Sequence, residues 1–280
     1  MELLNEHAAF GGRQCFFRHD SAEIGLPMRF ALYLPPEPKA LLVFLAGLTC
    51  TEETFTMKAG AQALASELGL ALLMPDTSPR GPEAAALPGA TESWDFGIGA
   101  GFYLDATQEP WASHWRMESY LIRELLPLVQ REFGLDAART GIFGHSMGGH
   151  GALTLALRHP SLFKSLSAFA PIAAPTQCPW GQKAFGGYLG EDRASWAAHD
   201  ASALMRTQAQ VPFPGGILVD QGLADKFLAE QLHPEALVAA CEAVSQPLTL
   251  RQHADYDHGY YFIASFVDDH LRHHAAQLLA

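Results

Sequence analysis

The chain has 280 residues, of which 49% are hydrophobic, and a formal net charge of −12. An acidic surface repels phosphate backbones, and no cluster of Lys or Arg interrupts it, so nucleic acid is excluded as an expected partner. The longest apolar runs, such as residues 40–46 and 68–74, are far shorter than the roughly 20 residues that span a bilayer, so we expect a soluble protein with no membrane partner.

The N-terminal half of the sequence predicts short strands followed by an alternation of strand and helix. Residues 14–19 and 28–34 have the pattern of antiparallel strands, and Pro35-Pro36 ends the second one. A more continuously apolar strand begins at Ala40, which indicates burial on both faces. We then expect a helix over 53–68, a buried strand over 69–75 and a long amphipathic helix over 115–133.

The C-terminal half continues this alternation. We expect strand 140–143, helix 147–158, strand 165–170, strand 216–221, helix 234–244, strand 248–253 and a last helix from Tyr260 onward. This order predicts an α/β fold with a mostly parallel central sheet, antiparallel N-terminal strands and helices on both faces. No Ser/Gly/Pro-rich linker divides the chain, so we expect one domain over residues 1–280.

Two long segments, 76–113 and 171–200, interrupt the alternation and are expected to be irregular. Both follow the carboxyl ends of predicted buried strands, which is where open α/β sheets bind their ligands. We therefore expect these segments to form the walls of an active site.

Cysteine usage and the first 14 residues bear on location. The N-terminus has neither the cationic start nor the apolar core of a secretory signal. The four cysteines are widely spaced and fit reduced thiols better than a disulfide or zinc framework: Cys15, Cys50, Cys178 and Cys241. We expect a cytoplasmic protein without a metal site.

The segment Gly144-His145-Ser146-Met147-Gly148 follows a short apolar run and precedes a predicted helix. It has the G-x-S-x-G pattern of a nucleophile elbow, in which small neighbours allow a serine to occupy a sharp strand-to-helix turn. This context makes Ser146 the candidate nucleophile.

An elbow serine needs an acid and a histidine, which follow it in that order in loops after later strands. His258 lies in a turn just before the last helix and is preferred to His253, which ends a predicted strand. Among the acids, Asp225 lies in the loop after the preceding strand. Asp220 is still within that strand, and Asp257 is a third choice as a turn residue.

The oxyanion formed during acyl transfer needs two backbone N–H groups. One comes from the residue after the nucleophile, Met147, and the other from the loop after the third predicted strand, Gly47-Leu48-Thr49-Cys50. We choose Leu48 as the second donor.

The remaining conspicuous side chains receive weaker roles. Trp94 and Trp180, like Phe96 and Trp111, could line a pocket, although aromatic residues in irregular segments more often pin those segments to the core. His145 and His150 are expected to pack beneath the elbow. The histidines of the last predicted helix are expected to be solvated or structural: His270, His273 and His274.

Several segments together resemble one family, S-formylglutathione hydrolase, also called esterase D, of the α/β-hydrolase superfamily. They are Leu45-Ala46-Gly47-Leu48-Thr49-Cys50-Thr51-Glu52, Pro75-Asp76-Thr77-Ser78-Pro79-Arg80-Gly81, Glu92-Ser93-Trp94-Asp95-Phe96-Gly97, residues 144–153, Asp220-Gln221-Gly222 with Asp225, and Tyr256-Asp257-His258 through Tyr261-Phe262-Ile263. The resemblance runs nearly end to end, and the family's catalytic serine, aspartate and histidine fall on Ser146, Asp225 and His258.

The resemblance implies hydrolysis of S-formylglutathione to glutathione and formate through a formyl-serine intermediate, without a metal or an organic cofactor. It also implies a possible homodimer, and it places a cysteine of the family at Cys50, whose alkylation could block the pocket. Glutathione is anionic, so local positive groups are expected near the site, with Lys58, Arg80, Lys183 and Lys226 as candidates. The alternatives are a general short-chain carboxylesterase or acetylesterase and, more remotely, a non-catalytic binding module with this fold.

Overall fold

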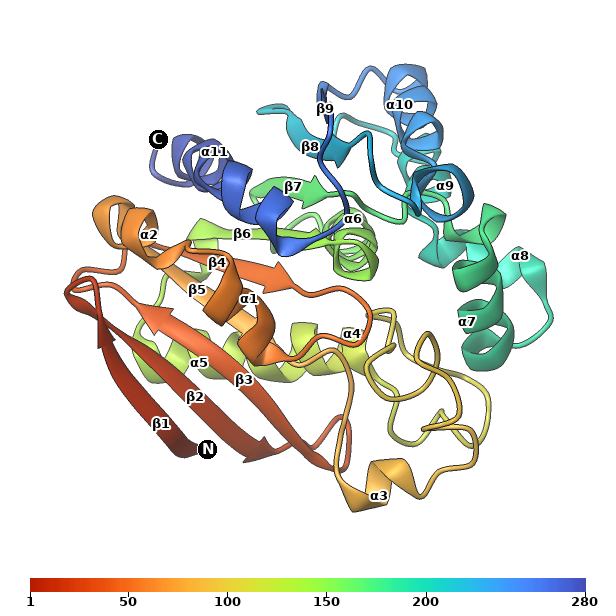
Figure 1. The fold of residues 1–280 in the computed structure, drawn as a ribbon, viewed down its shortest axis with the longest axis horizontal. Coiled ribbons are helices and arrows are strands. Elements are labelled where there is room, and N and C mark those ends of the chain that lie inside the picture. Colours follow the sequence, from red (N-terminus) through yellow and green to blue (C-terminus); the bar gives the residue numbers. More distant parts are fainter.

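A single nine-stranded sheet runs through the molecule (Figure 1). The computed structural model describes all residues from 1 to 280. The strands are β1 (Glu2–Ala9), β2 (Gly12–Asp20), β3 (Pro27–Leu34), β4 (Ala40–Leu45), β5 (Leu70–Pro75), β6 (Thr140–His145), β7 (Ser165–Phe169), β8 (Ile217–Gly222) and β9 (Leu248–His253). They are ordered β1-β2-β3-β5-β4-β6-β7-β8-β9, with β4 to β9 parallel and the first three antiparallel. The expected α/β architecture is confirmed.

Helices cover both faces of the sheet. The α-helices are α1 (Glu52–Lys58), α2 (Gln62–Leu68), α3 (Pro82–Ala85), α4 (Met117–Ser119), α5 (Leu126–Phe133), α6 (Met147–Arg158), α7 (Pro179–Leu189), α8 (Arg193–Trp196), α9 (Ala201–Arg206), α10 (Pro234–Ala243) and α11 (Tyr260–Leu278). Two π-helical segments are η1 (Tyr120–Leu125) and η5 (Leu228–Leu232), and the 3-10 turns are η2 (Ala137–Arg139), η3 (Pro175–Gln177) and η4 (Ala197–His199). Helices α1, α2 and α11 pack together on one face, and α5 and α6 lie on the other (Figure 1). No helix is both long and apolar enough to cross a membrane.

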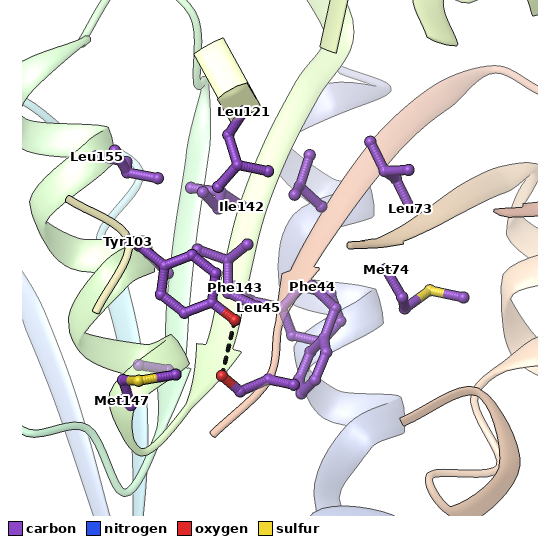
Figure 2. Close-up of a cluster of buried hydrophobic side chains, with 14 of the residues drawn as sticks. Phe44, Leu45, Leu73, Met74, Tyr103, Leu121, Ile142, Phe143, Met147 and Leu155 are labelled. Atoms are coloured by element: carbon purple, nitrogen blue, oxygen red, sulfur yellow. Dashed lines mark hydrogen bonds between the residues drawn. The ribbon is translucent and has the colours of Figure 1, made fainter. Parts of the chain in front are cut away.

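The core between the sheet and helix α6 joins the strand ends that carry the site. Figure 2 shows Leu73 and Ile142 from the sheet beside Leu121 and Leu155 from the helices. Burying each such side chain contributes about 1.5–3 kcal/mol to folding. The Tyr103 hydroxyl reaches into this cluster and donates a 2.8 Å hydrogen bond to the carbonyl of Ala46, just after β4. The core thus holds the loop after β4 in place.

Strand β1 is the one strand that the sequence did not predict. It is an edge strand whose side chains are nearly all exposed or half-exposed, so it lacks an alternation of apolar and polar residues. Its position depends on antiparallel backbone pairing with β2, from Glu2 opposite Arg18 to Ala9 opposite Gly12. Backbone pairing of this kind leaves no signal in side-chain hydrophobicity.

Two of the predicted helices have other bounds or another geometry in the structure. The helix expected over 53–68 is two helices, α1 and α2, because Gly60 takes a left-handed conformation, with φ of +72°, between them. The helix expected over 115–133 begins at Met117 and is π-helical over η1. Pro127, which follows η1 in the chain, has no N–H to donate to the preceding turn, so the hydrogen-bond pattern of the helix is perturbed there.

The segment 171–200 is not irregular as expected, since it contains α7 and α8. The glycines of this segment hide the helical pattern in the sequence. In the structure they allow close packing, since a Cβ at Gly181 would lie 2.0 Å from the carbonyl oxygen of Pro175. The other predicted strands and helices lie within a few residues of their expected bounds.

Candidate active site

Ser146 occupies a strained turn between β6 and α6. Its φ of 58° and ψ of −120° are unusual for a residue with a side chain. The turn is held by a hydrogen bond from the Ser146 N–H to the Phe169 carbonyl (3.0 Å). A Cβ on Gly148 would lie 1.9 Å from the Leu45 carbonyl oxygen, and one on Gly144 would lie 2.2 Å from the Gly148 oxygen. Only glycine fits on both sides of the serine.

Asp225 and His258 are brought together from different loops at the carboxyl edge of the sheet. Asp225 follows β8 and His258 follows β9, and Nδ1 of His258 lies 2.5 Å from Oδ2 of Asp225. The Asp225 side chain has no exposed surface, whereas 16% of the His258 side chain is exposed. A hydrogen bond from Nδ1 to the carboxylate leaves Nε2 as the ring nitrogen that can accept a proton.

Two further donors fix the Asp225 carboxylate. The backbone N–H of Phe227 donates to Oδ1 (2.8 Å), and the Gln221 side-chain amide donates to Oδ2 (3.3 Å). Gln221 was not among the residues predicted from the sequence, because an amide at the end of a buried strand has no distinctive pattern. With His258, these donors surround the carboxylate and set its orientation.

The rival acid Asp220 belongs to a separate buried cluster. It pairs with Nε and Nη2 of Arg251 (2.6 and 2.5 Å), and Nε2 of His253 lies 3.3 Å from Oδ1. Burial alone would raise the pKa of Asp220, but hydrogen bonds from His270 and Arg251 lower it far below its ordinary range. Asp257 is exposed and accepts a hydrogen bond from the Gly259 N–H. Only Asp225 contacts His258.

The loop after β4 faces the serine. A Cβ on Gly47 would lie 3.2 Å from the Cβ of Ser146. Hydrogen bonds from Thr49 N–H to the Gly99 carbonyl (2.8 Å) and from Cys50 N–H to the Gly47 carbonyl (3.2 Å) fix the loop. The Leu48 N–H donates to no protein acceptor. Met147 begins α6, where the first N–H groups have no partner within the helix. Both amides expected from the sequence are thus available at this end of the sheet.

Aromatic rings lead from the surface to His258. Trp94, which is 55% exposed, packs edge-on against the buried Trp180, with ring centroids 5.5 Å apart. Trp180 packs against Phe227 at 4.7 Å, and Phe227 packs against the ring of His258 at 5.0 Å. These contacts connect Trp94 and Trp180 to the ring of His258 through Phe227. Phe227 was missed because nothing in the sequence distinguishes it from a core residue.

The opposite side of His258 is lined by neutral groups. The ring of His145 lies 4.4 Å from the ring of His258, and neither of its nitrogens has a hydrogen-bond partner. Burial lowers the pKa of His145 well below its ordinary value, so the ring is uncharged at neutral pH. Cys50 is a free, half-buried thiol beside Tyr260, and burial raises its pKa. The partly exposed imidazole of His258 therefore has an uncharged neighbour in the buried ring of His145.

The other histidines expected to be structural have buried partners. His270 and His274 have no exposed surface and are linked through the Ser167 hydroxyl, to which their ring nitrogens lie at 2.8 and 2.9 Å. His273 is half-buried against the Leu166 carbonyl. His270 and His274 are therefore structural, in agreement with the expectation that the histidines of this helix are solvated or structural. No group of three or more potential metal ligands occurs in the structure.

Of the four basic residues that were expected near the site, two form ion pairs and two do not. Arg80 pairs with Asp76 (2.9 Å), and Lys183 pairs with Asp95 (2.5 Å). Lys58 and Lys226 make no ion pair; they lie over the rings of Tyr260 and Phe227, at 5.7 and 4.9 Å from the centroids. The Tyr260 ring lies 6.1 Å from the ring of His145 and the Phe227 ring 5.0 Å from the ring of His258, so both unpaired lysines lie near these two histidines.

Comparisons with known proteins identify the family of this chain. The Esterase family model matches residues 21–273. An S-formylglutathione hydrolase of Rattus norvegicus is 48% identical over 287 residues, which cover all of both chains. The structure of an S-formylglutathione hydrolase from Agrobacterium tumefaciens superposes with a TM-score of 0.95 at 48% identity, over 99% of this chain and 100% of that one.

More distant structures share the fold alone. A fluorophosphonate-binding serine hydrolase of Staphylococcus aureus superposes with a TM-score of 0.74 at 18% identity, over 94% of this chain and 98% of that one. The full-length identity to the rat and Agrobacterium proteins is far higher than this. The chain therefore belongs to the S-formylglutathione hydrolase family of esterases.

Proposed function

We propose that this protein hydrolyses the thioester S-formylglutathione to glutathione and formate, with Ser146 as nucleophile, His258 as base and Asp225 as the orienting acid. The observation that carries the proposal is the contact between His258 and Asp225, which lies at the same sheet edge as a serine held in an elbow turn. The 48% identity to two S-formylglutathione hydrolases supports the choice of substrate.

In the first half-reaction, Nε2 of His258 takes the proton of the Ser146 hydroxyl as its oxygen attacks the formyl carbon. The resulting oxyanion accepts hydrogen bonds from the Leu48 and Met147 amides. Asp225 stabilises the imidazolium through Nδ1. The C–S bond then breaks, and glutathione leaves as a thiolate that takes up the proton from His258. A thiol has a pKa of about 8.5, so the leaving group needs little acid assistance.

In the second half-reaction, water attacks the formyl ester on Ser146. His258 takes the proton from water and returns it to the serine oxygen as formate leaves. The same two amides hold the second oxyanion. All proton transfers pass through one imidazole, so the reaction requires no metal or organic cofactor.

Glutathione is anionic, and the unpaired lysines Lys58 and Lys226 support its recognition. In a protein of net charge −12, these two groups supply positive potential near His258. Arg80 and Lys183 are already neutralised by carboxylates. Trp94 and Trp180 offer a hydrophobic surface for the peptide part of the substrate.

We place this activity in the cytoplasm, which suits four free cysteines, and assign it to a single domain over residues 1–280. The homodimer implied by the resemblance stays a prediction, which light scattering would test.

The test is a comparison of kcat/KM for S-formylglutathione, longer S-acyl glutathiones and p-nitrophenyl acetate. The proposal predicts that S-formylglutathione is the best substrate of the series. A kcat/KM that is equal or higher for p-nitrophenyl acetate would instead indicate a general carboxylesterase. Absence of turnover with every substrate would indicate a binding module.

A further inference from the structure

A cavity lies at the same edge of the sheet as Ser146, and none of the three proposed catalytic residues lines it. Its volume is about 550 Å³, and it is lined by the start of β3, the start of α1 and the loop after β5. Phe30 of β3 pairs with Pro75, the last residue of β5. Residues 27–29, which line the cavity, therefore lie at the carboxyl edge of the parallel strands.

The charged side chains of this cavity are only partly paired. Asp76 and Arg80 form an ion pair with a nitrogen–oxygen distance of 2.9 Å. Arg29 is exposed and forms no ion pair. Glu52 is only 4% exposed, and its carboxyl group makes no hydrogen bond or ion pair with another residue. The carboxylates of Glu53 and Glu83 also line the cavity without ion pairs, but both side chains are exposed to water. Glu52 is thus the one buried carboxyl group of the lining that lacks a partner from another residue, and Arg29 is the one guanidinium group without an ion pair.

A buried carboxylate without a partner is costly, because charge is poorly solvated away from water. Burial and the nearby charge of Asp76 raise the pKa of Glu52 to about 7, and Arg29 opposes this only in part. A bound cation would stabilise the carboxylate, and a bound anion would pair with Arg29. The lining therefore favours a ligand that carries an ammonium and a carboxylate close together.

We propose that the cavity binds the γ-glutamyl end of the glutathione moiety, with its ammonium on Glu52 and its α-carboxylate on Arg29. This assignment rests on the proposed function, since S-formylglutathione carries that zwitterion at the end remote from glycine. It also accounts for a cavity that the catalytic residues leave unused.

The distance between the two sites suits this substrate. Strands β6 and β3 are separated by β4 and β5, so three spacings of ~4.8 Å place the cavity about 14 Å from the end of β6. The chain of glutathione from its sulfur to its amino nitrogen extends about 10 Å by standard bond lengths. The extent of the cavity and the length of the Glu52 side chain account for the difference between these two distances. Arg80, which lines the cavity, donates a hydrogen bond from Nη2 to the carbonyl of Cys50 (2.8 Å), at the end of the loop that faces Ser146.

The experiment compares S-formylglutathione with its N-acetyl derivative, which lacks the ammonium charge. KM and kcat are measured for the wild-type enzyme, Glu52→Gln and the control Glu67→Gln, whose side chain is exposed on α2 and outside the cavity. For the wild-type enzyme, N-acetylation should raise KM about tenfold, the usual effect of losing a charged hydrogen bond. In Glu52→Gln this ratio should fall toward one, while Glu67→Gln should retain the wild-type ratio.

Two results would overturn the assignment while leaving the proposed function intact. One is efficient hydrolysis of both substrates by the wild-type enzyme with equal KM values, which needs no variant and so does not depend on Glu52→Gln folding. The other is a Glu52→Gln enzyme that discriminates as strongly as the wild-type enzyme. If the wild-type enzyme does not hydrolyse S-formylglutathione, the proposed function fails and this assignment fails with it.

Discussion

Replacing Asp225 by Asn tests the proposed role of the acid with almost no change of shape. The carboxylate accepts three hydrogen bonds, from His258 Nδ1, the Phe227 N–H and the Gln221 amide. An Asn side chain has one acceptor oxygen and an NH₂ group, so at least one of these donors must face another donor. The variant loses the charge that stabilises the imidazolium and favours the wrong tautomer of His258. The corresponding substitution in serine proteases lowers kcat by about 10⁴.

For Asp225→Asn we therefore expect kcat for S-formylglutathione to fall by about 10³–10⁴, equivalent to ~4–5.5 kcal/mol of transition-state stabilisation. Thermal unfolding should show that the variant remains folded. The matched control is Asp257→Asn, because Asp257 is an exposed turn residue next to His258; its kcat should stay within about twofold of wild type. A folded Asp225→Asn enzyme with more than a tenth of the wild-type kcat would refute the reasoning.

Three further predictions concern stability and reactivity. Gly148→Ala would place a Cβ 1.9 Å from a main-chain oxygen, so urea unfolding should show a loss of about 3 kcal/mol or more, or no folded protein; an unchanged midpoint would contradict this. Burial raises the pKa of Cys50, so alkylation of this thiol by iodoacetamide should be slow at pH 7 and should accelerate above pH 9. Cys50→Ser should resist inactivation by iodoacetamide. An inactivation rate that does not change with pH would show that the Cys50 thiolate does not control the reaction. Hydrogen bonds lower the pKa of Asp220 below its ordinary value of 3.8 despite burial, so its contribution to stability is complete above that pH and is lost as the pH falls below it. Asp220→Asn should lower the free energy of unfolding by about 3 kcal/mol or more at pH 7 and by less near pH 3, and an equal effect at both pH values would contradict the linkage.

The sequence was sufficient to predict the parts of the fold in which apolar periodicity and chain order carry the information. Strands β4 to β8 are buried runs with clear ends. The order of serine, acid and histidine along the later strands reduces the candidates for the catalytic base from thirteen histidines to two. The choice of Asp225 over Asp220 depended on position relative to a strand end, and the contact with His258 agrees with it.

Other features depend on long-range packing and could not be predicted from the sequence. Strand β1 depends mainly on backbone pairing with β2, and glycines of α7 allow close contact with Pro175 and Phe96. Phe227 and Gln221 contact the proposed triad only because the loop after β8 folds back on itself. The isolation of Glu52 likewise follows from the packing of β3 and α1, which are distant from each other in sequence.

The most direct test of the central claim is to identify the residue that carries the acyl group. The enzyme would be mixed with S-formylglutathione, quenched in acid within milliseconds, digested and examined by mass spectrometry. The account predicts a formyl group on the peptide that contains Ser146, and none in Ser146→Ala, which should also lose turnover. A formyl group found on another residue such as Cys50, or undiminished turnover by Ser146→Ala, would contradict it.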